Sequence, residues 1–208
     1  MDVMFEAMVD RYLLHALEAE RGAVEVYVTA LATTPNPAWR RELTQFLDDA
    51  RKHEQWMTCA CNQVGMDPEE PVAGRDVIAF QTLAMIEAIR GASRGGDPLL
   101  ALLVACECIV FAETRNQLAW APFARMAANV DHGCVQILSR LATDVRREHE
   151  HHLRRATQRM KALWRRRLGL GRPAHACIVQ IPHAGSAANG GSHPAQLREL
   201  PPHDALVA

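Results

Sequence analysis

Two stretches of this sequence each place a single carboxylate on a helix face that is otherwise largely apolar. Glu20 fills the missing turn of one stripe, and Glu107 fills the same gap in another. The stripes run through Leu13, Leu17, Val24, Tyr27 and Leu31, and through Leu100, Leu103, Val110 and Thr114. A carboxylate among apolar side chains is costly unless a cation or a hydrogen-bond donor meets it there. The spacing therefore predicts that Glu20 and Glu107 face a polar centre inside the protein.

Histidine also falls on a predicted buried face. His53 lies on a line of apolar residues at helical spacing, and Asp49 precedes it by one turn. The apolar line consists of Leu43, Phe46, Leu47, Ala50 and Met57. Residues four apart on a helix are neighbours, so this pattern predicts a titratable pair, Asp49 and His53, at the buried side of the helix.

Residues 148–152 read Glu-His-Glu-His-His. Because each residue turns an α-helix by about 100°, counting along this cluster shows which of its side chains lie on the apolar face of the helix. The apolar stripe of this helix runs through Leu138, Leu141, Ala142, Val145, Ala156 and Met160. On this count His149 and His152 fall inside the stripe, Glu148 lies at its edge, and His151 faces away. Glu148 and His152 are one turn apart, so the pair could share an ion.

The candidate ligands therefore combine carboxylates and imidazoles from four predicted helices. They are Glu20, His53, Glu107 and His149, with Asp49, Glu148 and His152 nearby. Such a set at the centre of a helix bundle is typical of iron and manganese sites, where carboxylates supply charge and imidazoles complete the coordination. The alternative is a metal-free polar core in which each buried carboxylate pairs with Arg or His.

Helix periodicity and turn-forming residues predict which elements must position these side chains. Helical patterns separated by Pro- and Gly-containing turns cover residues 3–33, 37–64, 77–90, 99–119 and 124–170. No useful length shows the alternation of a β-strand. We therefore expect an all-α fold, an antiparallel four-helix bundle with a short crossover helix, over residues 1–168. Residues 169–208 are rich in Gly, Pro and His without a sustained period, which predicts a flexible tail.

Charge and composition argue against several classes of function. The 208 residues include 23 Lys and Arg against 24 Asp and Glu, so no excess charge indicates nucleic-acid or membrane binding. The N-terminal segment carries acids and does not resemble a signal peptide, and no apolar run is long enough to span a membrane. Six cysteines in such a chain do not imply disulfides. We expect a cytoplasmic protein.

The spacing of Glu20 and Tyr27, seven residues apart, together with a histidine on each of two further helices, resembles the pattern of the ferritin-like superfamily. Its rubrerythrin-like and bacterioferritin-like members carry a Glu seven residues before a Tyr, then Glu-x-x-His, and the same elements again. The resemblance covers roughly residues 10–165 and implies a di-iron oxidoreductase, with iron or manganese bound in the bundle and oxidase or peroxide-scavenging activity. It also implies a homodimer or higher homo-oligomer and an external electron donor.

This sequence departs from that pattern at three positions. Ala50 and Arg146 stand where the two Glu-x-x-His elements would have their Glu, and Thr114 replaces the second Tyr. Either Asp49 and Glu148 take the place of the missing carboxylates, or the chain is a metal-free interaction protein that kept only the helix plan. A third reading is a di-iron hydroxylase of an organic substrate, which would need a roomy pocket beside the centre.

Overall fold

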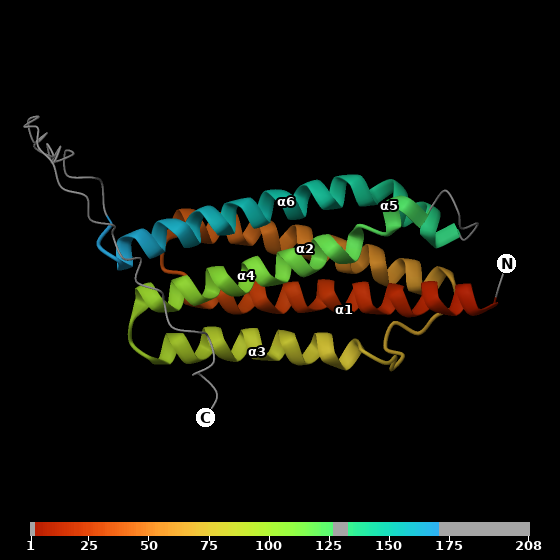
Figure 1. Ribbon diagram of the computed structural model, residues 1–208, viewed down its shortest axis with the longest axis horizontal. Coiled ribbons are helices and arrows are strands. Elements are labelled where there is room, and N and C mark those ends of the chain that lie inside the picture. Colours follow the sequence, from red (N-terminus) through yellow and green to blue (C-terminus); the bar gives the residue numbers. More distant parts are fainter. Residues whose placement is uncertain (1–2, 127–132, 171–208) are drawn as a thin grey trace, which may run out of the picture. The chain divides into compact units, whose positions relative to one another are not determined.

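The computed structural model describes residues 3–126 and 133–170, and this part of the chain is entirely α-helical apart from turns, which confirms the predicted all-α class. Its helices, coloured along the chain in Figure 1, are α1 (Val3–Thr33), α2 (Pro37–Gln63), α3 (Arg75–Arg94), α4 (Pro98–Trp120), α5 (Phe123–Met126) and α6 (Gly133–Arg167). Residues 171–208, with most of the expected tail, lie outside the described residues.

Side-chain caps explain where two of the helices that carry the site begin. Asn36 accepts a hydrogen bond from the Trp39 backbone amide at 2.9 Å, and Pro37 occupies the first turn of α2. Asp97 accepts from the backbone amides of Leu99 and Leu100, both at 3.0 Å, and a proline again follows the cap. Each cap satisfies amides that have no partner within the helix, and proline costs nothing there because it lacks the amide proton.

The long helices lie side by side, as Figure 1 shows, and their contacts define which faces are buried. Helix α1 packs against α2, α3 and α4, and α6 packs against α2 and α4. Helix α3 packs against both α1 and α4, so α4 is covered by three helices. Buried apolar residues consequently occur around most of the α4 surface, including Ala101, Leu102, Leu103, Ala105, Cys106, Cys108, Ile109 and Ala112.

The apolar core is divided into two clusters with a polar layer between them. One cluster contains Tyr27, Phe46 and Ile109, and the other contains Leu13 and Trp120. On α1, α2, α4 and α6 alike, buried charged or imidazole side chains fall between the positions that each helix contributes to the two clusters. No helix of the described residues is long and apolar enough to cross a membrane.

Candidate metal centre

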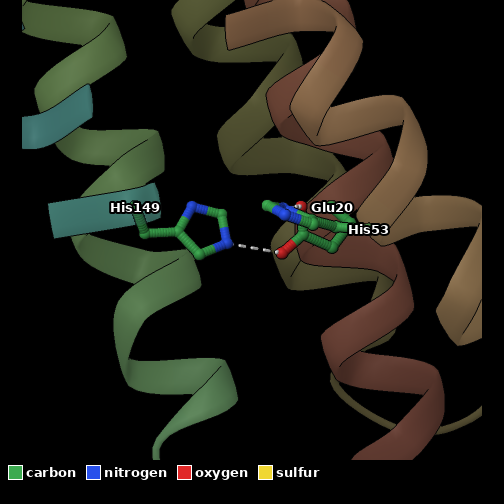
Figure 2. Close-up of side chains that lie close together, drawn as sticks. All are labelled: Glu20, His53 and His149. Carbon is green, nitrogen blue, oxygen red and sulfur yellow. Dashed lines mark hydrogen bonds and ion pairs between the residues drawn. The ribbon is translucent and has the colours of Figure 1, made fainter. Parts of the chain in front are cut away.

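Five side chains from four helices meet in this polar layer. They are Glu20 of α1, His53 of α2, Glu113 of α4, and His149 and His152 of α6. None is more than 2% exposed to solvent. Figure 2 shows the His149 ring directed at the Glu20 carboxylate, with the His53 ring beside it. Two carboxylates and three imidazoles are therefore removed from water together, which is costly unless each group finds a partner.

The five side chains form two groups that share His149. In the first, His149 Nε2 lies 3.1 Å from Glu20 Oε1, and His53 Nδ1 lies 3.8 Å from Glu20 Oε2. In the second, His149 Nδ1 lies 2.8 Å from Glu113 Oε2, and His152 Nδ1 lies 3.6 Å from Glu113 Oε1. Within each group, one donor atom per residue lies within 4.8 Å of the others. Each group thus consists of two histidines and one carboxylate.

Three buried atoms of these groups have no hydrogen-bond partner within the described part of the chain: Glu20 Oε2, His53 Nδ1 and His152 Nδ1. Two ligands about 2.0–2.2 Å from one ion are separated by roughly 3–3.5 Å. The separations of 3.6 and 3.8 Å between the carboxylate oxygens and Nδ1 atoms are too long for hydrogen bonds but close to this value. The donors of each group therefore fit a cation, and a cation bound in a group would satisfy the unpartnered atoms of that group after shifts of a few tenths of an ångström.

The opposite nitrogens of His53 and His152 face two outer carboxylates. His53 Nε2 donates to Glu148 Oε2 at 2.7 Å, and His152 Nε2 lies 3.4 Å from Asp49 Oδ2. Each histidine thus faces the carboxylate of the other helix, whereas the sequence pointed to pairs within one helix. The Nδ1 atom of His53 faces the Glu20 carboxylate at 3.8 Å, an arrangement that a cation between them would stabilise. Ligating histidines commonly have such outer partners, and Asp49 and Glu148 contact candidate ligands rather than join either group.

Two aromatic side chains hold the inner carboxylates in place. The Trp120 indole Nε1 donates to Glu20 Oε1 at 2.6 Å, and the Tyr27 hydroxyl donates to Glu113 Oε1. Each aromatic residue lies seven positions after one carboxylate on its own helix and donates to the carboxylate of the other helix. This reciprocal pairing sets the register of α1 against α4 and orients both carboxylates toward His149.

The charged groups of the centre strongly shift the pKa values of one another. Burial lowers the pKa of His149, but the charges and hydrogen bonds of Glu20 and Glu113 outweigh burial and raise that pKa to about 10. Burial raises the pKa of Glu113, whereas His149 and His152 lower it to about 2, and histidine contacts also place the pKa of Glu20 far below its usual range. Without a metal, His149 is therefore an imidazolium between two carboxylates at neutral pH.

Helix α4 requires a correction, because Glu107 does not lie at the centre. Its side chain is partly exposed and accepts a hydrogen bond from Trp164 Nε1 at 3.3 Å. Glu113, six residues later, is fully buried and supplies the carboxylate instead. The apolar stripe was misleading because three helices cover α4, so burial on this helix does not mark one inward direction. A usable signal was present: Glu113 precedes Trp120 by seven residues, as Glu20 precedes Tyr27.

The other expected directions agree with the structure. His149 and His152 are buried and His151 is exposed, as the angular count predicted, so the literal Glu-x-x-His at 148–151 does not point into the core. Arg146 is exposed, and Ala50 packs in the apolar core rather than in the polar layer. On α6 the centre is therefore supplied by His149 and His152, a His-x-x-His element.

A surface cavity of about 580 Å³ reaches the edge of the centre between α2 and α6. Asp49, Glu148, His151 and His152 contribute to its lining, together with further charged or polar side chains, Gln45, Arg147, Glu150 and Arg154. His152 belongs both to this lining and to one of the two ligand groups. Small polar molecules and ions in this cavity can therefore reach a residue of the centre.

The chain matches none of the protein-family models, curated proteins or solved structures with which it was compared. The resemblance to ferritin-like proteins consequently rests on its own residues and their arrangement.

Proposed function

We propose that this chain is a ferritin-like, antiparallel four-helix bundle that binds iron or manganese at the polar layer between its two apolar clusters. The observation that carries this proposal is the pair of ligand groups, Glu20, His53 and His149 with Glu113, His149 and His152, buried together. The proposed activity is that of an oxidase or peroxide scavenger, supplied with electrons by an external donor. Self-association and a cytoplasmic location complete the proposal.

Unsatisfied atoms favour a metal over a purely polar core. A metal-free core pairs His149 with both carboxylates but leaves Glu20 Oε2, His53 Nδ1 and His152 Nδ1 without partners within the described residues. Each buried polar atom left in this state costs about 1–3 kcal/mol. A cation bound between each carboxylate and its histidines would remove these costs and would also offset the desolvation of the carboxylates.

The ligand types favour iron in particular. Two histidines and one carboxylate with open positions form the ligand set of non-haem Fe(II) sites, and carboxylate-rich sites also accept manganese. When bound, iron supplies open coordination positions for O₂ or peroxide and a change of oxidation state. The chain's own residues hold the ligands: Tyr27 and Trp120 orient the carboxylates, and Asp49 and Glu148 face the outer histidine nitrogens.

The cavity of about 580 Å³ beside the centre is large enough for a small organic molecule, so its size agrees with the hydroxylase reading and only its lining bears on the choice between a scavenger and a hydroxylase. Its lining is charged and polar, including Arg147, Glu150 and Arg154, whereas pockets for organic substrates are lined mainly by apolar and aromatic side chains. This lining favours small polar reactants such as peroxide over a large organic substrate.

Metal analysis of two matched variants on α4 tests the proposed function. We expect Glu113→Ala to lose at least half of the iron or manganese bound by the wild-type protein, because Glu113 belongs to a ligand group. Glu107→Ala should retain all of it, because Glu107 is partly exposed, belongs to neither ligand group and accepts a hydrogen bond from Trp164. Protein loaded anaerobically with Fe²⁺ or Mn²⁺ and then desalted would be measured by elemental analysis. The tail histidines are common to all variants, so differences report the centre. Absence of metal from the wild-type protein would contradict the proposal.

The outer carboxylates are expected to tune affinity rather than to bind the metal. Glu148→Ala should weaken metal binding by about 10–100-fold, since it removes the acceptor that orients His53. Glu150→Ala is the matched control, because Glu150 lines the same cavity but belongs to neither ligand group. Competition with a fluorescent chelator for Mn²⁺ measures both variants. Equal affinities would show that His53 is oriented by packing alone.

A further inference from the structure

His149 is the one residue common to both ligand groups of the described chain, and it presents a different ring nitrogen to each. Nε2 faces Glu20 at 3.1 Å and Nδ1 faces Glu113 at 2.8 Å. The two nitrogens of an imidazole ring point to opposite sides, so one ion cannot be bound by both. The two groups therefore cannot be alternative descriptions of one mononuclear site.

The geometry points to a two-ion centre in which the His149 ring is the ligand shared by both ions. One ion would take Glu20, His53 and Nε2 of His149, and the other would take Glu113, His152 and Nδ1 of His149. This inference rests on the proposed metal binding, and it adds the group that joins the two ions.

The unsatisfied atoms are distributed as two ions require. Glu20 Oε2 and His53 Nδ1 belong to one group, and His152 Nδ1 belongs to the other. A single ion would satisfy one group and leave the other with a buried atom that lacks a partner. Two ions would satisfy both, each held by one carboxylate, one unshared histidine and one nitrogen of the shared ring.

The structure offers an imidazole where a carboxylate would otherwise join two ions. Ala50, one turn before His53 on α2, lies in the apolar core and has no oxygen to offer. Carboxylate-bridged ions lie about 3.5–4 Å apart, and a five-membered ring between two ions holds them farther apart. Both ring nitrogens of His149 bind in this arrangement, and their two protons leave to the buffer.

The charges of the centre and its rim suit two divalent ions. Two ions bring four positive charges to Glu20, Glu113 and the doubly deprotonated His149 ring, which together carry three negative charges. Asp49 and Glu148 face the outer nitrogens of the unshared histidines, and Asp49 is itself paired with Lys52 at 2.9 Å, so the rim adds about one negative charge. The buried charge is therefore nearly balanced, as a centre with so little exposure requires.

Counting ions in single variants tests the shared ligand. The full chain would be loaded with Mn²⁺, desalted and measured by elemental analysis. We expect two ions per chain in the wild-type protein, one in His53→Ala, one in His152→Ala and none in His149→Ala. His151→Ala, altered at the exposed histidine of the same helix, should keep two. His149→Glu should also bind two, because a carboxylate has two oxygens to share, and circular dichroism would verify that each variant is helical.

An electron paramagnetic resonance measurement tests the shared ligand without relying on any variant of His149. A shared ring couples the two Mn²⁺ spins, so the wild-type spectrum should differ from the sum of the one-ion spectra of His53→Ala and His152→Ala. One ion per chain in the wild-type protein, one ion retained by folded His149→Ala, or a wild-type spectrum equal to that sum would overturn the shared ligand and leave metal binding intact. No Mn²⁺ and no Fe²⁺ in the wild-type protein would remove the proposed function itself.

Discussion

Replacement of His149 by alanine is expected to lower the free energy of unfolding of the metal-free protein by about 3–5 kcal/mol, the usual cost of breaking a buried ion pair from one side. The ring is 1% exposed and lies between Glu20 and Glu113, at 3.1 and 2.8 Å. Without it, two buried carboxylates lose the cation between them. Trp120 and Tyr27 still donate one hydrogen bond each, which is not enough to replace a charge.

Urea unfolding of chelator-treated protein measures this effect. His151→Ala is the matched control, because it removes an exposed imidazole from the same helix and should change stability by no more than about 0.5 kcal/mol. Similar unfolding midpoints for the two variants would contradict the placement of a charged His149 between the carboxylates.

The metal-free protein is also expected to lose stability as the pH rises from about 6.5 toward 10. The pKa of His149 is raised from 6.5 to about 10 in the folded protein. Between these values the folded protein holds a proton that the unfolded chain has released, so the free energy of unfolding falls with rising pH. Since one pKa unit corresponds to about 1.4 kcal/mol, the loss across this window is on the order of several kcal/mol.

At acidic pH the stability of the metal-free protein is expected to change in the opposite direction and to fall as the pH falls. The reason is that the pKa of Glu113 is lowered to about 2 in the folded protein. Its contribution is present above the ordinary pKa of a glutamate and is lost as the pH falls through about 2. Urea midpoints measured from pH 5 to pH 10 test the alkaline loss, which His149→Ala should abolish. Metal-loaded protein should not show it, because bound ions replace the protons and bind more tightly as the pH rises. An unchanged alkaline loss in His149→Ala would assign it to another group.

The sequence by itself determined which segments are helical and which side chains of α2 and α6 point into the core, whereas the expected short helix at 77–90 is the 20-residue helix α3, Arg75–Arg94. Asn36 and Asp97 followed by proline mark two helix starts through local chemistry that needs no tertiary contact. The angular count separated buried His149 and His152 from exposed His151, because α6 has one apolar face and one solvated face. His53 could be identified for the same reason, whereas Glu20 was identified by its place in an apolar stripe even though α1, like α4, packs against three helices.

Only the tertiary structure decided which carboxylate α4 contributes and how the groups pair. A helix covered by three neighbours buries residues in most directions, so the apolar stripe cannot distinguish Glu107 from Glu113. The crossing of Tyr27 to Glu113 and of Trp120 to Glu20 depends on the register of α1 against α4, which no single helix encodes. The position of His149 between two carboxylates likewise arises from packing, because it joins residues 129 and 36 positions away in the chain.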